Sequence, residues 1–267
     1  MPELAEVRTV ASTLKRKLIG KTVTDTIIIY PKIIEPESIP LNNLIGCTLK
    51  DIETKGKYLL FNFGTLSLIS HLRMEGKYFI KEKSDPIEKH EHIIINFDNV
   101  SLRYHDTRKF GRMCIVNKED IMNYPALKKL ADEPFTMDKE KLYSHIHAKS
   151  KPIKILLLEQ DIIAGLGNIY ADEVLYQSKI SPFRLGNTIT LEECDNIITS
   201  AKEILTKAIE EGGTTIKSYT SSLGVIGNYQ NFLKVHKKEG QACKCGTIIK
   251  RIKLGGRSTY YCENCQR

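Results

Sequence analysis

The chain has 267 residues, of which 41% are hydrophobic and 27% are charged. This length allows two domains of ordinary size, and the composition is that of a globular protein. No apolar run is long enough for a membrane span, and the opening MPELAEVRTV lacks the basic and apolar regions of a secretory signal. We therefore expect a cytoplasmic protein that does not contact a membrane.

The net charge of +8 indicates attraction to polyanions such as nucleic acids. Many basic proteins do not bind nucleic acid, however. Charge alone therefore leaves nucleic-acid binding open, and the decision rests on motifs.

A helix is predicted over residues 3–18. Pro2 suits the first helical position, and Gly20 marks the end. Apolar residues recur there at steps of three and four and form one stripe: Leu4, Val7, Val10, Leu14 and Leu18.

Residues 22–116 are predicted to be all β. Short apolar or alternating runs follow one another and are separated by turn signals such as Gly64-Thr65 and Asp98-Asn99. Many short strands at this spacing favour a β-sandwich. The runs are TVTDTIIIY, YLLFNF, LSLIS, HIIINF, VSLRY and RMCIV.

The pattern changes after Tyr124-Pro125. The next stretch, to residue 150, has many charges and is predicted to be a linker with little strand. Helices are then predicted, the last of them between Thr190 and Gly212-Gly213. Residues 213–236 have little periodicity and are interpreted as a long functional loop. The predicted helices span residues 153–160, 168–179 and 191–211.

The cysteines fall into two groups. Cys47, Cys114 and Cys194 are scattered and are interpreted as plain thiols. The other four form two close pairs, which in a cytosolic chain favour a tetrahedral zinc site over disulfides or free thiols. The first pair has one spacer residue where two are usual, which leaves its geometry open. The predicted ligands are Cys243, Cys245, Cys262 and Cys265.

Basic residues lie between the two cysteine pairs. On a metal-held hairpin they could clamp DNA phosphates, or they could form a solvated face. They are Lys250, Arg251, Lys253 and Arg257.

Two internal turns carry candidate binding residues. Gly165 and Gly167 precede Asn168, predicted as an N-cap, at a helix start that could grip a phosphate or be a simple turn. In the run 106–112, Arg108 flanks Phe110, which could wedge into a base stack or be one buried aromatic.

The N-terminus offers a nucleophile. Once Met1 is removed, Pro2 carries a secondary amine with a pKa near 8, which a helix N-terminus would lower further. Attack on a sugar C1′ would give an iminium ion that drives elimination, with Glu3 and Glu6 as proton donors or acceptors. Taken alone, Pro-Glu indicates only a helix start.

These signals share one explanation, because the chain resembles the formamidopyrimidine-DNA glycosylase (Fpg/MutM) family from end to end. The opening MPELAEV is similar to the family's MPELPEVE, although Ala5 and Arg8 depart from it. Further blocks match in order: GKYLLF at 56–61, SHLRMEGKY at 70–78, HDTRKFGR at 105–112, LLLEQDIIAGLGNIYADEVLY at 156–176, GGTT at 212–215 and GRSTYYCENCQ at 256–266.

The resemblance implies a two-domain α+β fold. Residues 1–131 would form a catalytic β-sandwich domain with a leading helix, and 132–150 a linker. Residues 151–236 would form a helix–two-turn–helix domain with a lesion-recognition loop, and 237–267 a β-hairpin zinc finger holding one structural Zn²⁺. Double-stranded DNA with oxidised bases or abasic sites would bind a monomer in the cleft between the domains, at the bacterial nucleoid.

The resemblance also implies roles for individual residues. Pro2 would be the nucleophile and Glu3 the proton donor, with Lys57 and Arg257 as further catalytic groups. The enzyme would excise 8-oxoguanine and formamidopyrimidines and cleave the strand by β,δ-elimination. The DNA-binding set would be His71, Met74, Arg108, Phe110 and Asn168. Lesion recognition would involve Glu6, Glu75, Thr214, Thr215, Ser218 and Tyr219.

Three alternatives remain at this point. An endonuclease VIII-like enzyme for oxidised pyrimidines typically opens PEGPEI, whereas this chain has Leu4. A non-catalytic protein that binds damaged DNA would not need Pro2, Glu3 and Lys57 together. A transcription-type zinc ribbon leaves the first 120 or so residues without a role.

Overall fold

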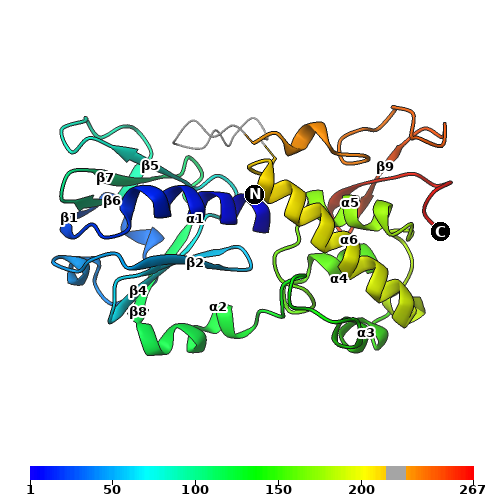
Figure 1. Cartoon of the computed structure of the whole chain (residues 1–267), viewed down its shortest axis with the longest axis horizontal. Coiled ribbons are helices and arrows are strands. Elements are labelled where there is room, and N and C mark those ends of the chain that lie inside the picture. The colour runs from blue at the N-terminus through cyan, green and yellow to red at the C-terminus, as the bar shows by residue number, and fades with distance from the viewer. Residues whose placement is uncertain (215–226) are drawn as a thin grey trace. The chain divides into compact units, whose positions relative to one another are not determined.

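The computed structural model describes residues 1–214 and 227–267 (Figure 1). They form two compact units. Unit 1 comprises Met1–Lys128 and Gly212–Asn228, and unit 2 comprises Lys129–Glu211 and Tyr229–Arg267. No helix of the described residues is long and apolar enough to cross a membrane.

Unit 1 begins with helix α1 (Leu4–Leu18), whose apolar stripe is buried as predicted. Its N-cap is Glu3, which forms a capping box with Glu6. Pro2 therefore precedes the helix, and its predicted place at the first helical position is wrong. The helix ends at Leu18, and Gly20 follows the C-cap Ile19 with a φ of +82°, which glycine adopts readily.

The predicted β-structure forms two antiparallel four-stranded sheets. The first has the order β1-β6-β7-β5 and consists of β1 (Val23–Ile28), β6 (Glu91–Phe97), β7 (Ser101–His105) and β5 (Lys77–Lys81). The second has the order β2-β3-β4-β8 and consists of β2 (Asp51–Lys55), β3 (Tyr58–Asn62), β4 (Leu66–His71) and β8 (Arg112–Asn117).

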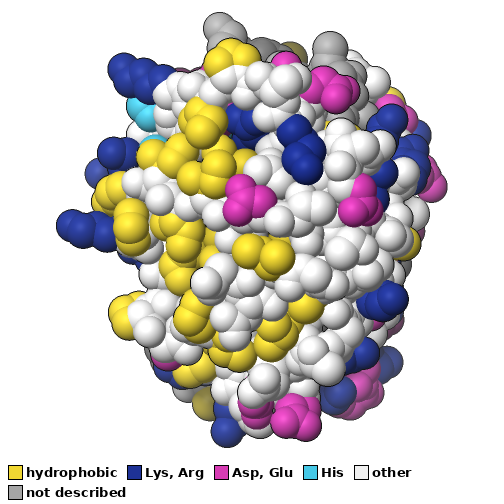
Figure 2. All heavy atoms as spheres, turned by 90° about the vertical axis from the view of Figure 1, so that its left-hand side faces the viewer, with side chains coloured by type: hydrophobic (Ala, Val, Ile, Leu, Met, Phe, Trp, Pro, Cys, Tyr) yellow, Lys and Arg dark blue, Asp and Glu magenta, His cyan; other side chains and the backbone are white. Residues whose placement is uncertain are grey.

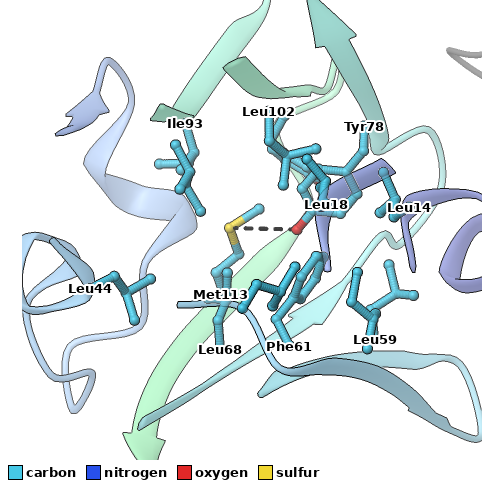
Figure 3. Close-up of a cluster of buried hydrophobic side chains, with 14 of the residues drawn as sticks. Leu14, Leu18, Leu44, Leu59, Phe61, Leu68, Tyr78, Ile93, Leu102 and Met113 are labelled. Atoms are coloured by element: carbon cyan, nitrogen blue, oxygen red, sulfur yellow. Dashed lines mark hydrogen bonds between the residues drawn. The ribbon is translucent and has the colours of Figure 1, made fainter. Parts of the chain in front are cut away.

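Apolar side chains from α1 and both sheets share one core (Figure 3). Leu14 and Leu18 of α1 point into the cluster that holds Phe61 of the second sheet and Tyr78 of the first. The Tyr78 hydroxyl lies 4.0 Å from the sulfur of Met113. Burial of this cluster is the main force that holds α1 and the two sheets together.

Strand β1 is an edge strand that leaves apolar side chains on the surface. Ile27 and Ile28 are exposed, and so is Ile29 directly after the strand. Figure 2 views the side of the molecule on which β1 lies, and hydrophobic side chains gather there.

The second sheet is followed by the 3₁₀ helix η3 (Lys118–Asn123) and the short helix α2 (Pro125–Lys128). Two further 3₁₀ turns, η1 (Pro31–Ile33) and η2 (Leu41–Leu44), connect β1 to β2.

Unit 2 is helical and ends in a β-hairpin. The helix α6 is capped by Thr190 through a capping box with Glu193, in agreement with its predicted start. Residues predicted as linker contain α3, which is capped by Asp138 and packs against α6. The elements are α3 (Lys139–His147), α4 (Ile153–Leu158), α5 (Asn168–Gln177), η4 (Gly186–Thr188), α6 (Leu191–Glu210), η5 (Tyr229–Asn231), β9 (Lys250–Leu254) and β10 (Arg257–Tyr261).

Candidate active site and metal centre

The four predicted metal ligands lie together at the base of the β9–β10 hairpin. Their sulfur atoms all lie within 4.8 Å of one another. The Cys243–Cys265 and Cys245–Cys262 sulfur separations are 3.8 and 3.5 Å. A disulfide would need roughly 2.0 Å, whereas tetrahedral zinc with bonds of about 2.3 Å places sulfurs about 3.8 Å apart. The residues fit one structural Zn²⁺, and the shortened Cys243–Cys245 spacing does not separate the ligands.

The hairpin presents Arg257 directly after its turn. Gly255 and Gly256 have φ values of +53° and +76°, which suit a tight two-residue turn. Lys250 is paired with Glu263 at 2.5 Å, and Arg251 with Glu239. Arg257 and Lys253 are exposed and form no ion pair with any residue that the structure describes. They are therefore the hairpin cations best placed to meet an external anion.

A buried ion pair attaches the hairpin to the helices. The Lys154 ammonium lies 2.6 Å from Asp172, and both side chains are 0% exposed. The same ammonium donates to the Ser258 carbonyl and to the Thr259 hydroxyl, each at 2.9 Å. Asp172 also contacts His236 at 2.7 Å. This network fixes strand β10, which begins at Arg257, and no local pattern in the sequence predicts it.

Asn168 is part of the same attachment. Its side-chain amide donates to the Ser258 carbonyl at 2.9 Å. It is the first residue of α5, whose N-cap is Gly167, so its prediction as an N-cap is wrong. The backbone N–H groups of the first turn of α5 still form the kind of helix N-terminus that binds phosphate.

The chain start in unit 1 lies among charged side chains. Pro2, Glu3 and Glu6 are buried. Burial lowers the pKa of the Met1 amino group, which stands at the chain start, below 8.0, and the charge of Lys57 lowers it further. The charges of Glu3, Glu6 and Glu75 oppose this shift. An amine with a lowered pKa is partly unprotonated at neutral pH, as a nucleophile must be.

Lys57 lies in the two-residue turn between β2 and β3 and is 4% exposed. Gly56, the first residue of this turn, has a φ of +56°. The turn is therefore tight enough to direct a lysine toward the chain start instead of solvent.

Glu6 organises the residues around the chain start. Its carboxylate accepts from the Glu3 backbone N–H at 2.9 Å. It also accepts from the Thr214 backbone N–H at 2.8 Å and from the Thr214 hydroxyl at 3.0 Å. Thr214 is buried in this contact. The other predicted lesion-recognition residues of this segment, Thr215, Ser218 and Tyr219, lie outside the described residues.

His71 is a neutral hydrogen-bond donor. Burial lowers the pKa of His71 to about 3, and the charges of Arg73 and Lys57 contribute. The Arg73 backbone N–H donates to Nδ1 at 2.9 Å, so the ring proton is on Nε2. The N–H on Nε2 is suited to a phosphate oxygen without adding positive charge.

Three predicted DNA-contacting side chains lie on two loops of unit 1. Met74 and Phe110 are 36% and 47% exposed, which is unusual for such large apolar residues. The Arg108 guanidinium lies 4.7 Å from the Phe110 ring centre. Phe110 is therefore an exposed aromatic residue, and the alternative interpretation of it as a buried one is wrong.

Fold and site together define a zinc-finger enzyme of the DNA glycosylase class. Residues 1–113 match the model of the formamidopyrimidine-DNA glycosylase N-terminal domain, and residues 130–220 match that of its H2TH domain. Residues 244–267 match a zinc finger found in FPG and IleRS. The chain belongs to the formamidopyrimidine-DNA glycosylase family.

Relatives and solved structures agree over the whole chain. Formamidopyrimidine-DNA glycosylases of Bacillus cereus and Streptococcus pneumoniae are 41% and 44% identical to it, and each alignment covers 100% of this chain and 99% of the relative. An Fpg variant of Lactococcus lactis in complex with Fapy-dG-containing DNA has a TM-score of 0.93 at 38% identity, with both chains covered fully. The Lactococcus lactis Fpg with abasic-site DNA has a TM-score of 0.92 at 38% identity, with 99% of each chain covered.

Proposed function

We propose that the protein removes oxidised purines from DNA and then cleaves the strand, with Pro2 as its nucleophile. The observation that carries this proposal is the amino group at the chain start. In the structure this group is the amine of Met1: burial lowers its pKa, and the charges of Glu3, Glu6 and Lys57 act on it. Removal of Met1 makes the Pro2 nitrogen the terminal amine and leaves it next to Glu3.

The first chemical step is a displacement at C1′ of the damaged nucleotide. The Pro2 nitrogen donates its lone pair to C1′ while the bond between C1′ and the base breaks. The base leaves with the electron pair of that broken bond and takes up the proton that the Pro2 nitrogen loses. Glu3 then protonates the ring oxygen as the sugar opens, and the nitrogen becomes an iminium ion.

The iminium ion next accepts electrons from the sugar. Loss of a proton from C2′ expels the 3′ phosphate, and a second elimination expels the 5′ phosphate. Hydrolysis of the iminium ion then returns Pro2 as the free amine. Lys57 stabilises the negative charge of the leaving phosphates, and Arg257 binds phosphate next to the lesion.

The remaining predicted residues bind the DNA around the lesion. A base that reacts at C1′ must leave the stack, which costs less for a damaged base. Met74, Arg108 and Phe110 fill the space it leaves. His71 donates Nε2–H to a phosphate, and the N-terminus of α5 at Asn168 binds another.

The zinc ion supports the hairpin and takes no part in the chemistry. Four protein thiolates would hold the ion, so no position would be left for a reacting water. The hairpin has a core of only a few side chains, among them Val235, Ile249 and Tyr260. Zinc therefore supplies most of the folding free energy that holds Arg257 in place.

The substrate class is tested by excision assays on matched duplexes that contain 8-oxoguanine, a formamidopyrimidine or thymine glycol. We expect base release and a one-nucleotide gap on the first two, and much slower release on the third. Faster release of thymine glycol would instead indicate an endonuclease VIII-type enzyme. Because the proposed substrate is bacterial chromosomal DNA, we place the protein in the cytoplasm, at the nucleoid. We also propose that it acts as a monomer.

A further inference from the structure

The hydroxyl of Tyr104 lies where two surface loops of unit 1 meet. Tyr104 is near the end of β7, and only 1% of it is exposed. Its ring packs edge-on against Tyr78, with ring centres 5.3 Å apart. Its hydroxyl donates to the Asp106 carboxylate at 3.3 Å. The ring therefore belongs to the core, while the hydroxyl reaches the layer directly under the loops.

Both loops carry a glycine that closes on this hydroxyl. A Cβ built on Gly76 would lie 2.2 Å from the Tyr104 oxygen, and a Cβ built on Gly111 would lie 1.7 Å from it. Real Cβ atoms do not approach an oxygen this closely. Glycine at these two positions thus lets two separate backbone segments pack against one side-chain oxygen.

Asp106 connects this oxygen to the second loop. Its carboxylate accepts from the backbone N–H groups of Arg108 at 3.0 Å and Gly111 at 2.8 Å. Its own backbone is fixed as well, because His92 Nε2 lies 2.9 Å from the Asp106 carbonyl oxygen. Asp106 is 0% exposed. The carboxylate therefore sets the path of the chain from residue 106 to residue 111.

The first loop is fixed in a similar way. The Gly76 backbone N–H donates to the Leu72 carbonyl at 2.9 Å. The Thr107 hydroxyl donates to the Glu75 carboxylate, which links the two loops directly. Each loop also has one non-glycine residue with positive φ, Arg73 at +52° and Lys109 at +58°. Such conformations persist where surrounding contacts determine them.

We infer that Tyr104 is a positioning residue that holds the two loops as one rigid wedge. The first loop carries Met74 and the second carries Arg108 and Phe110. This inference rests on the proposed function, in which these side chains fill the space of the everted nucleotide. A wedge that is ordered before DNA arrives loses less conformational entropy when it inserts.

The test is a Tyr104→Phe variant, which keeps the ring and removes the hydroxyl. The probe is a duplex with a tetrahydrofuran site, a stable abasic analogue, and 2-aminopurine in the facing strand. We expect the wild-type protein to change the 2-aminopurine fluorescence as the wedge inserts, and the variant to give a clearly smaller change. We also expect kcat/KM on 8-oxoguanine DNA to fall about tenfold, because the free energy of one buried hydrogen bond corresponds to a change of about that size.

Two further variants separate positioning from general stability. Tyr78→Phe removes a hydroxyl that donates to Ser70 at 2.7 Å in the same core. We expect it to lower the melting temperature as much as Tyr104→Phe does while leaving the fluorescence signal intact. In a Phe110→Ala background, Tyr104→Phe is expected to cause little further loss, because both act on the same wedge.

The outcomes distinguish failure of this inference from failure of the proposed function. If the wild-type protein is active and Phe110→Ala impairs it, but Tyr104→Phe keeps the full signal and rate, Tyr104 does not position the wedge. Equal signal losses in Tyr104→Phe and Tyr78→Phe would also overturn the inference, since both would then act through stability. A wild-type protein without activity on 8-oxoguanine DNA would instead contradict the proposed function.

Discussion

Glu6 and Thr214 are 208 positions apart in the sequence, yet the Glu6 carboxylate lies 2.8 Å from the Thr214 backbone nitrogen. Gly213 makes this approach possible. Its φ is +80°, and a Cβ there would lie 3.0 Å from the Glu6 carboxylate. The pair joins the first turn of α1 to the beginning of the segment predicted to recognise the lesion.

Glu6→Gln is expected to shift the acidic limb of the pH profile of borohydride trapping to lower pH. The negative charge of Glu6 raises the pKa of the Met1 amine, and we expect it to act in the same direction on the Pro2 amine once Met1 is removed, so its loss lowers that pKa. The free amine then persists to lower pH. The measurement is the rate of borohydride trapping on abasic-site DNA between pH 5 and 8. An unchanged or upward-shifted limb would show that Glu6 does not act on the amine.

Lys57→Met is expected to move the same limb in the opposite direction. The Lys57 charge lowers the pKa of the amine, so its removal raises that pKa and reduces the free amine at neutral pH. Strand cleavage is expected to fall further than trapping, because Lys57 also stabilises the leaving phosphates. Lys55→Met, in the same hairpin, is the matched control. A downward shift in Lys57→Met would contradict the assignment.

His71 and Arg257 are expected to differ in their salt dependence. The pKa of His71 is about 3, so His71 contributes no charge to DNA binding above pH 5. His71→Gln should weaken binding without changing the slope of log Kd against log salt. Arg257→Gln should reduce that slope by about one, which is the contribution of a single phosphate contact. The measurement is fluorescence anisotropy on tetrahydrofuran-site DNA, and a reduced slope for His71→Gln would show that His71 is charged.

Zinc removal is expected to weaken DNA binding strongly without unfolding unit 1. Chelation or Cys262→Ser leaves the hairpin without its main source of folding free energy. We expect DNA affinity to fall about a hundredfold or more, because phosphate contacts dominate affinity. Circular dichroism should retain the β-signal of the sandwich. Cys47→Ser, a change of a cysteine outside the cluster, should have little effect; full binding by a zinc-free protein would refute a structural zinc.

Lys154→Met is expected to lower the free energy of unfolding by about 3–5 kcal/mol, because it leaves Asp172 buried without its cation. It should also weaken DNA binding, since the hairpin is attached through Ser258 and Thr259. Denaturant unfolding measures the first effect. Lys151→Met removes an exposed pair with Glu159 and should cost under about 1 kcal/mol. Similar losses in the two variants would argue against the buried network.

The sequence predicted the parts of the fold that have strong periodicity. Helix α1, six of the eight sandwich strands and the helices α4 to α6 follow from apolar spacing and capping residues. Strands β2 and β5 were missed because both are charged edge strands, each with a single fully buried side chain, Ile52 and Tyr78. Helix α3 was missed because Pro134 and many charges conceal its short apolar face.

The metal centre was predictable because the spacing of the four cysteines carries its chemistry. Pro2 was singled out by its place at the chain start, and its role as nucleophile stays a prediction. The candidate site was not predictable where its chemistry depends on burial. Lys154 has no local sign of being buried, and its partner Asp172 lies on another helix. The contact of Glu6 with Thr214 and that of Tyr104 with Gly76 and Gly111 likewise join segments that are separated in the sequence.

The most direct test of the mechanism is borohydride trapping on 8-oxoguanine DNA, followed by intact-mass analysis and peptide mapping. We predict a covalent adduct on a chain that has lost Met1, with the modified atom on Pro2 and no adduct in Pro2→Gly. An adduct on an internal lysine, or full trapping by a chain that retains Met1, would contradict the account.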